Sequence, residues 1–367
     1  MAAAKDAVYF PSLHGLRAVA AFAVLFTHVE RYKQAMGRPS CWGMPFNSLV
    51  GSLAVTFFFV LSGFLITSLL LRERAGTGYI DIKKFLAKRM LRIWPLYYTV
   101  LIGGYLVSIF LLKDTPSDSL RNGFFLNLFL LSNVAFALNK IPEVLIQIWS
   151  IGTEEQFYFL WPFLLKRLRI KALARCFILL IIGWFVVRLL VARLAGADSF
   201  LNILLYRTRI DCMAIGGLAA LPVLHKRGLR GYPAQLYKII LHRMSLWIAC
   251  LAFAGLLWIS WKYNVSLYQG YAILFAVILL QVIHRPVRLL ETAPVKYAGK
   301  ISFGIYLLHH FWVFFVFKVW PGSNGLLDTS PLGDLAAFGI VSLLTLITAS
   351  LSYEYFESRF LRRKDRL

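Results

Sequence analysis

The chain has 367 residues, of which 59% are hydrophobic, with a mean hydropathy of +0.68 and a formal net charge of +23. It holds many apolar runs near the length of about 20 residues that crosses a bilayer, which excludes an ordinary soluble fold. The basic residues lie in short clusters between these runs, which is typical of cytoplasmic loops and not of a nucleic-acid-binding surface. Alternatively, some of these cations bind an anionic cofactor. We predict an all-α polytopic membrane protein with one transmembrane domain, residues 1–367, and no appended soluble domain.

Ten apolar runs are predicted to span the membrane. They cover residues 13–33, 49–71, 93–112, 149–165, 176–195, 202–224, 245–261, 267–284, 301–320 and 333–353. A further stretch, 121–139, is ambiguous because asparagines and a glycine interrupt it. We expect this stretch to be re-entrant or to lie on the surface, since partial insertion is allowed where protein or water covers the backbone.

The distribution of basic residues sets the predicted topology. Five segments hold 26 of the 40 Lys and Arg residues: 72–92, 166–175, 225–243, 285–300 and 359–366. Ten spans place all five segments in the cytoplasm, with both chain termini, as the positive-inside bias requires. An eleven-span arrangement, in which 121–139 crosses fully, is the rival. Segment 72–92 is expected to lie along the inner face before the chain turns inward at Pro95.

The first span carries two costly polar groups, Arg17 and His28. Eleven residues bring them to nearly the same helix face, separated by about 16 Å along the axis. Polar groups inside a membrane usually face the bundle interior, so the pair indicates a path through the protein with His28 near the outer end. The alternative is that Arg17 extends to the inner interface and His28 only ends the helix.

Two arginines precede the third span in KRMLRIWPLYY, residues 88–98. Arg89 and Arg92 are three residues apart and share a helix face. Guanidinium groups bind phosphate oxygens in a bidentate manner, so this pair is a candidate site for a phosphate-bearing cofactor at the inner membrane face. A simple positive-inside signal is the alternative.

The fourth span begins with adjacent carboxylates in IWSIGTEEQFYFLWP, residues 148–162. Glu154 and Tyr158 are four residues apart and share a face, and the topology places Glu154 at about the level of His28. A carboxylate there could orient the histidine or hold an acceptor hydroxyl. An interhelical pair with an arginine is the alternative.

Polar residues also enter two later spans. Arg209 and Asp211, which follow Arg207, do not face each other on an ideal helix, so each is expected to pair across the bundle, near glycines that permit close helix approach. His309 and His310 lie in another span, behind Tyr306. We predict a hydrogen-bonding role for them and no metal, because no HExxH-like spacing is present.

Taken together, these motifs resemble those of a known family. The chain contains, in order, HGLRAVAAFAVLFTH, FFFVLSGFLI, KRMLRIWPLYY, WSIGTEEQFYFLWP, RIDCMAIGG and GKISFGIYLLH. This order is similar to that of the acyltransferase-3 family of bacterial membrane proteins, which includes O-antigen, macrolide and Nod-factor acyltransferases. The resemblance runs over nearly the whole chain. His14 stands where many members of the family have Asp.

The resemblance implies roles for individual residues. It assigns catalysis to His28, Glu154 and Arg17, and cofactor binding to Arg89, Arg92 and Arg17. We add, as candidate substrate-binding residues, Tyr158, Arg209, Asp211 and His309. No metal is assigned.

The implied reaction moves an acyl group, most simply acetyl, from cytoplasmic acyl-CoA to a hydroxyl of a glycan, glycolipid or lipo-oligosaccharide. Direct transfer with His28 as general base and a covalent acyl-histidine both remain open. Longer acyl donors, the identity of the acceptor and the oligomeric state also remain open. The alternative function is a transporter or flippase of a glycan precursor, because polar groups along one face also suit a transport path.

Overall fold

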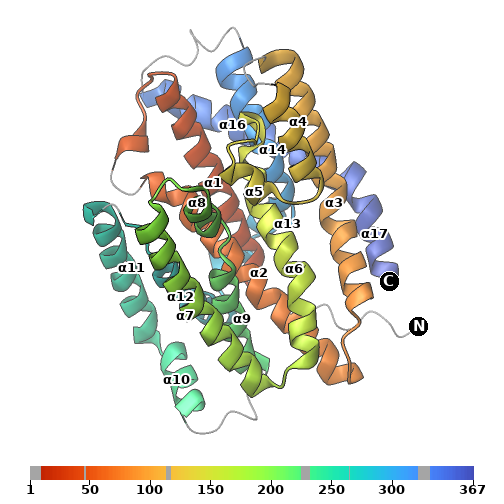
Figure 1. Cartoon of the computed structure of the whole chain (residues 1–367), viewed down its shortest axis with the longest axis vertical. Helices are drawn as coiled ribbons and strands as arrows, with labels where there is room; N and C mark the ends of the chain where they lie inside the picture. The colour runs from red at the N-terminus through yellow and green to blue at the C-terminus, as the bar shows by residue number, and fades with distance from the viewer. Residues whose placement is uncertain (1–9, 45–46, 113–116, 225–231, 264, 321–330) are drawn as a thin grey trace.

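The computed structural model describes residues 10–44, 47–112, 117–224, 232–263, 265–320 and 331–367. Every regular element within these residues is a helix, which confirms the predicted all-α class. Figure 1 shows the long helices running roughly along the longest axis of the molecule.

The helices follow one another closely along the chain. The α-helices are α1 (Leu13–Ala35), α2 (Asn47–Thr77), α3 (Ile82–Val107), α4 (Ser117–Leu128), α5 (Ser132–Ala137), α6 (Trp149–Arg167), α7 (Ile170–Ala195), α8 (Phe200–Arg207), α9 (Ile210–Leu224), α10 (Tyr232–Leu241), α11 (Arg243–Tyr263), α12 (Tyr268–His284), α13 (Ala293–Lys300), α14 (Ser302–Phe314), α16 (Pro331–Leu351) and α17 (Ser358–Arg366). Six tighter or wider helical segments join them: Cys41–Gly43, Ser108–Leu112, Glu143–Ile148, Arg288–Glu291, Phe315–Val319 and Ser352–Glu357.

Six helices among the described residues are long and apolar enough to cross a membrane, so the chain is a multi-pass membrane protein, but ten spans are not confirmed. The six are Leu49–Thr77, Ile82–Leu111, Ile170–Ala195, Arg243–Tyr263, Ser302–Val319 and Leu335–Lys364. Helix α1 is not among the six, since it carries several charged residues and histidines, and α12 is apolar but only 17 residues long. The orientation in the membrane stays a prediction. Residues 1–9 and 225–231, on which part of it depends, lie outside the described residues.

Two expectations about element boundaries are wrong. The predicted span 202–224 is not one helix, because the chain leaves α8 at Thr208 and starts α9 at Ile210. Segment 72–92 does not form a separate surface segment that turns inward at Pro95 either. Its first residues extend α2, and Asp81, whose side chain accepts a hydrogen bond from the Lys84 amide at 3.0 Å, starts α3, which runs on through Pro95.

The ambiguous stretch 121–139 contains no continuous spanning helix, as predicted. Helix α4 stops at Leu128 and α5 is only six residues long. Leu130 and Asn139 have positive φ angles of 60° and 55°, which a continuous helix cannot contain. The chain therefore turns back on itself here and delivers the start of α6 to the centre of the bundle (Figure 1).

Helices α2 and α9 cross at a pair of glycines, as expected from the glycine-containing motif. A Cβ atom at Gly216 would lie 1.9 Å from the carbonyl oxygen of Val60, and one at Gly63 would lie 1.9 Å from the carbonyl oxygen of Met213. Backbone-to-backbone contact of this kind is possible only without side chains. It holds α2, which lines the site described below, at the middle of the bundle.

We expect Gly216→Val to lower the free energy of unfolding by at least ~2 kcal/mol, because the new side chain must push α9 away from α2. Thermal unfolding of the purified protein in detergent measures the loss. Gly183→Val is the matched control, since a Cβ at Gly183 in α7 meets no atom within 4 Å. Equal stability of the two variants would contradict the close crossing.

Candidate active site

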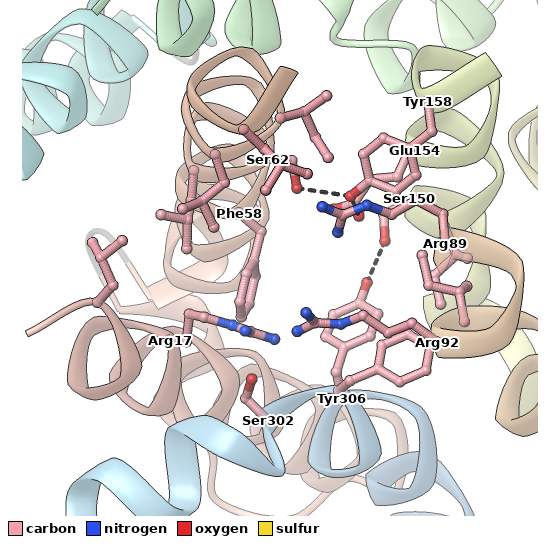
Figure 2. A pocket seen from close by; sticks show the side chains of 18 of the residues that line it. Arg17, Phe58, Ser62, Arg89, Arg92, Ser150, Glu154, Tyr158, Ser302 and Tyr306 are labelled. Carbon is pink, nitrogen blue, oxygen red and sulfur yellow. Dashed lines mark hydrogen bonds between the residues drawn. The ribbon is translucent and has the colours of Figure 1, made fainter. Parts of the chain in front are cut away.

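A cavity of about 330 Å³ lies among five helices, within the range of about 300–1,000 Å³ typical of small-molecule sites. Its walls come from α1, α2, α3, α6 and α14 (Figure 2). The polar residues that line it are His14, Arg17, Ser62, Ser68, Arg89, Arg92, Ser150, Glu154, Tyr158, Ser302 and Tyr306. Five of the predicted site residues therefore meet in one place: Arg17, Arg89, Arg92, Glu154 and Tyr158.

Three guanidinium groups share this cavity. Figure 2 shows those of Arg17 and Arg92 facing each other across it. Arg89 lies over the ring of Tyr158, with 5.6 Å between the guanidinium carbon and the ring centroid. Among the described residues, no carboxylate forms an ion pair with any of the three arginines. The cavity thus carries an excess of positive charge that an anion would compensate.

Among the described residues, Glu154 is the one carboxylate that lines the cavity, and a neighbouring tyrosine holds it. Glu154 accepts a hydrogen bond of 2.6 Å from the Tyr158 hydroxyl, which is also 3.1 Å from the Ser62 hydroxyl (Figure 2). The adjacent Glu155 points elsewhere and accepts a hydrogen bond of 2.9 Å from the Trp94 indole. The two carboxylates therefore have separate partners, and Glu154 is the one beside the arginines.

His28 lies in a separate cluster of three imidazoles. Its Nδ1 is 2.7 Å from Nε2 of His309, and its ring centroid is 4.5 Å from that of His310. His309 Nδ1 lies 3.1 Å from the carbonyl oxygen of Ile305, which can only accept, so this nitrogen carries the proton. In neutral His309, Nε2 must then accept a hydrogen bond from His28 Nδ1. The contact leaves the Nε2 lone pair of His28 available as a base.

The expectation that Glu154 lies level with His28 is wrong. The hydroxyl of Ser150, one turn before Glu154, is 2.7 Å from the hydroxyl of Tyr306, and Tyr306 precedes His309 by three residues. The two helices run in opposite directions, so Glu154 and the histidines are displaced to opposite sides of this contact, by about 10 Å in total. The Tyr306 ring, 6.1 Å from that of His309, lies between the arginine-lined cavity and the imidazoles.

The imidazole cluster also has the composition of a metal site. The candidate ligand atoms of His28, His309 and His310 all lie within 4.8 Å of one another. The closest two are 2.7 Å apart, whereas ligands of a tetrahedral zinc ion with bonds of about 2.0–2.1 Å are roughly 3.3 Å apart. A metal would therefore require the rings of His28 and His309 to separate and their hydrogen bond to break.

The geometry agrees with the comparison to known proteins. A family profile described as an acyltransferase domain matches residues 10–354. The chain belongs to this acyltransferase family. The match includes all five helices that line the cavity and both helices that supply the imidazoles. No solved structure matches the chain.

Curated relatives of this chain are named as O-acetyltransferases. The peptidoglycan O-acetyltransferase OatA of Listeria monocytogenes is 28% identical over 82% of this chain and 49% of its own length. The putative peptidoglycan O-acetyltransferase YrhL of Bacillus subtilis is 28% identical over 95% and 54%, and a putative O-acetyltransferase of Staphylococcus aureus is 26% identical over 97% and 58%. The chain spans about half the length of these relatives.

Arg209 and Asp211, predicted to bind substrate, lie outside the cavity and have protein partners. The Arg209 guanidinium donates to the Ser52 carbonyl, the Ser52 hydroxyl and the Thr56 hydroxyl of α2 at 2.7–3.0 Å. It also lies 3.4 Å from the centroid of the Tyr268 ring. Asp211 is fully buried and faces Arg188 of α7 at 3.8 Å. Both pair across the bundle as expected, and these contacts explain them as structural groups that hold α9 in place.

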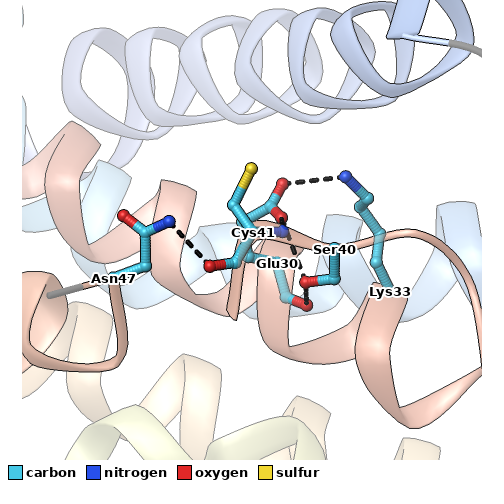
Figure 3. Close-up of polar contacts among 5 residues, drawn as sticks. All are labelled: Glu30, Lys33, Ser40, Cys41 and Asn47. Carbon is cyan, nitrogen blue, oxygen red and sulfur yellow. Dashed lines mark hydrogen bonds and ion pairs between the residues drawn. The ribbon is translucent and has the colours of Figure 1, made fainter. Parts of the chain in front are cut away.

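A polar network that was not predicted from the sequence links the end of α1 to the residues that follow it. Glu30 is 3.0 Å from the ammonium of Lys33 and accepts hydrogen bonds from the Ser40 hydroxyl and the Cys41 amide (Figure 3). The side chain of Asn47 in turn donates to the Cys41 carbonyl at 2.6 Å. The loop is thereby fixed against the end of α1 that carries His28. An i, i+3 pair of opposite charges was the one signal of it in the sequence.

We expect Arg209→Gln to lower the free energy of unfolding by about 2–4 kcal/mol, because buried acceptors on α2 lose a charged donor. Thermal unfolding in detergent measures it. Arg89→Gln is the matched control and should leave stability nearly unchanged. A stable Arg209→Gln protein with altered acceptor use would instead support the substrate-binding role predicted from the sequence.

Proposed function

We propose that the protein is an inner-membrane O-acetyltransferase that moves an acetyl group from cytoplasmic acetyl-CoA to a hydroxyl of a cell-surface glycan, with peptidoglycan as the first candidate. The observation that carries this proposal is the cavity in which Arg17, Arg89 and Arg92 meet with a single carboxylate among the described lining residues. Membership of the acyltransferase family and the names of its relatives support the reaction class.

The arginine-lined cavity suits the phosphate-bearing end of coenzyme A. Arg89 and Arg92 lie near the start of α3, and the basic segment around them is predicted to face the cytoplasm. Their guanidinium forks match phosphate oxygens, and no described carboxylate competes for them. Arg17 lies opposite, so bound phosphates would separate the like charges. The cavity extends to Ser150 and Tyr306, which would bring the thioester close to the imidazoles.

In the chemical step, His28 acts as the general base. Its Nε2 takes the proton of the acceptor hydroxyl while the hydroxyl oxygen bonds to the thioester carbonyl carbon. The carbon–sulfur bond then breaks, and the imidazolium returns the proton to the sulfur, giving the acetyl ester and free CoA. His309 fixes the required tautomer through the 2.7 Å contact. Glu154, which bonds Tyr158 instead of His28, would act on the coenzyme side of the site.

The coenzyme assignment predicts a selective effect of arginine substitution. Arg89→Gln and Arg92→Gln should raise KM for acetyl-CoA about 10- to 100-fold, because each removes charged hydrogen bonds to phosphate. Neither should change KM for acetyl-pantetheine, which has no phosphate, by more than about threefold. Steady-state kinetics in proteoliposomes measures both. Arg169→Gln, an exposed arginine in another basic segment, is the control. Equal losses with both donors would argue against phosphate binding.

The assignment of the base predicts a different pattern for the histidines. His28→Ala should abolish acetyl transfer. His309→Leu should lower kcat about 10- to 100-fold with little change in KM for acetyl-CoA, because His28 loses the partner that orients it. Membrane abundance must be unchanged in each case, and His242→Ala, on an exposed residue, serves as the control. Full activity of His28→Ala would remove His28 from the chemistry.

A further inference from the structure

Among the described residues, one arginine outside the cavity has neither a hydrogen-bond acceptor nor an ion-pair partner. Arg207 ends α8, and its guanidinium carbon lies 4.1 Å from the centroid of the Phe136 ring and 4.9 Å from that of Trp149. Its Nε is buried without a hydrogen-bond acceptor, and no described carboxylate forms an ion pair with it. Arg209, two residues later, has every guanidinium nitrogen engaged by protein acceptors. The unsatisfied groups of Arg207 therefore distinguish it from its neighbour.

Arg207 belongs to the side of the protein where the imidazoles lie. Trp149, beneath its guanidinium, is followed by Ser150, whose hydroxyl contacts Tyr306, one turn before the histidines. Arg31, one turn after His28, is exposed and is close enough to act electrostatically on both His28 and Arg207. Arg31 thus acts on both His28 and Arg207, and the rings of Phe136 and Trp149 pack against the guanidinium of Arg207. Arg207 itself keeps part of its surface exposed, so a ligand can reach it.

We propose that Arg207, assisted by Arg31, binds an oxyanion carried by the acceptor glycan, and that the rings of Phe136 and Trp149 hold the guanidinium in place. The proposal rests on the proposed function, because it names the class of acceptor that the same site takes. The oxyanion is a carboxylate or a phosphate on the sugar whose hydroxyl His28 deprotonates.

The physical reason is the cost of an unpaired buried donor. Leaving a guanidinium without an acceptor is expensive, and an oxyanion can accept from its two terminal nitrogens, which are not buried as Nε is and so are the part of Arg207 that a ligand can reach. The aromatic rings fix the plane of this fork and stabilise its charge, but they accept no strong hydrogen bond. A neutral sugar would satisfy the donors without balancing the charge of Arg207 and Arg31. An anionic acceptor does both.

The test uses the full-length protein in proteoliposomes with acetyl-CoA and three soluble acceptors. These are an N-acetylglucosaminyl–N-acetylmuramic acid disaccharide with its free carboxylate, the methyl ester of that disaccharide, and an N-acetylglucosamine disaccharide 1-phosphate. We expect kcat/KM of the wild type to be at least about 10-fold higher for an anionic acceptor than for the ester. The preferred anion identifies the carboxylate or the phosphate.

Arg207→Met should reduce this preference to within about twofold while leaving KM for acetyl-CoA unchanged. Arg207→Lys should retain part of it, and Arg31→Gln should reduce it less than Arg207→Met. Arg193→Gln removes an exposed cation from the end of α7 and should keep the full preference. If Arg207→Met fails to bind acetyl-CoA and is therefore misfolded, the lysine and Arg31 variants decide the question.

Two results would overturn the inference. Equal use of ester and anionic acceptors by the wild type would show that no oxyanion is recognised, although acetyl transfer itself would stand. If Arg207→Met lowers kcat/KM by the same factor for all three acceptors, the residue has only a structural role. Failure of the wild type to acetylate any acceptor would count against the proposed function first, and the inference would fall with it.

Discussion

The constraint on which the site depends is the charge imbalance inside the bundle. Arg17, Arg89 and Arg92 come from two helices and meet in one cavity, where Glu154 is the one carboxylate among the described lining residues and is already held by Tyr158. Like charges in a poorly solvated space repel strongly, so this arrangement is stable only if water or a bound anion separates them. The helices that create the imbalance are themselves fixed by contacts elsewhere, such as the glycine crossing of α2 and α9.

Helix α14 contributes residues both to this cavity and to the imidazole cluster. Tyr306 lines the cavity, and His309 and His310 follow it by three and four residues, about one helical turn. The hydroxyl of Tyr306 is fixed by the Ser150 hydroxyl at 2.7 Å and by the Gln147 carbonyl at 2.9 Å. The ring of Tyr306 therefore has a defined position between the cavity and the imidazole cluster. A donor bound on one side and an acceptor on the other would therefore meet around a single side chain, which is an arrangement suited to transfer between two aqueous phases.

Much of the site could be predicted from local spacing. The i, i+3 relation of Arg89 and Arg92 and the i, i+4 relation of Glu154 and Tyr158 depend on helix geometry alone, and both pairs are found together. The partner of His28 could not be predicted, because it depends on the heights of α6 and α14 relative to α1, which the sequence does not encode locally. The fold shows the same division: the helical class follows from hydropathy, whereas the break at Thr208 depends on the tertiary contacts of its neighbours.

The break at Thr208 gives two chemically identical side chains, those of Arg207 and Arg209, different surroundings. The chain leaves α8 after Arg207 and begins α9 at Ile210, so the two side chains diverge although one residue separates them. Arg209 reaches hydroxyl and carbonyl groups of α2, and its charge is spread over acceptors that belong to the protein. Arg207 reaches aromatic rings, which leave its hydrogen-bonding capacity unused. In a bundle where every polar group is costly, a guanidinium without an acceptor among the described residues is where we propose that a ligand supplies one.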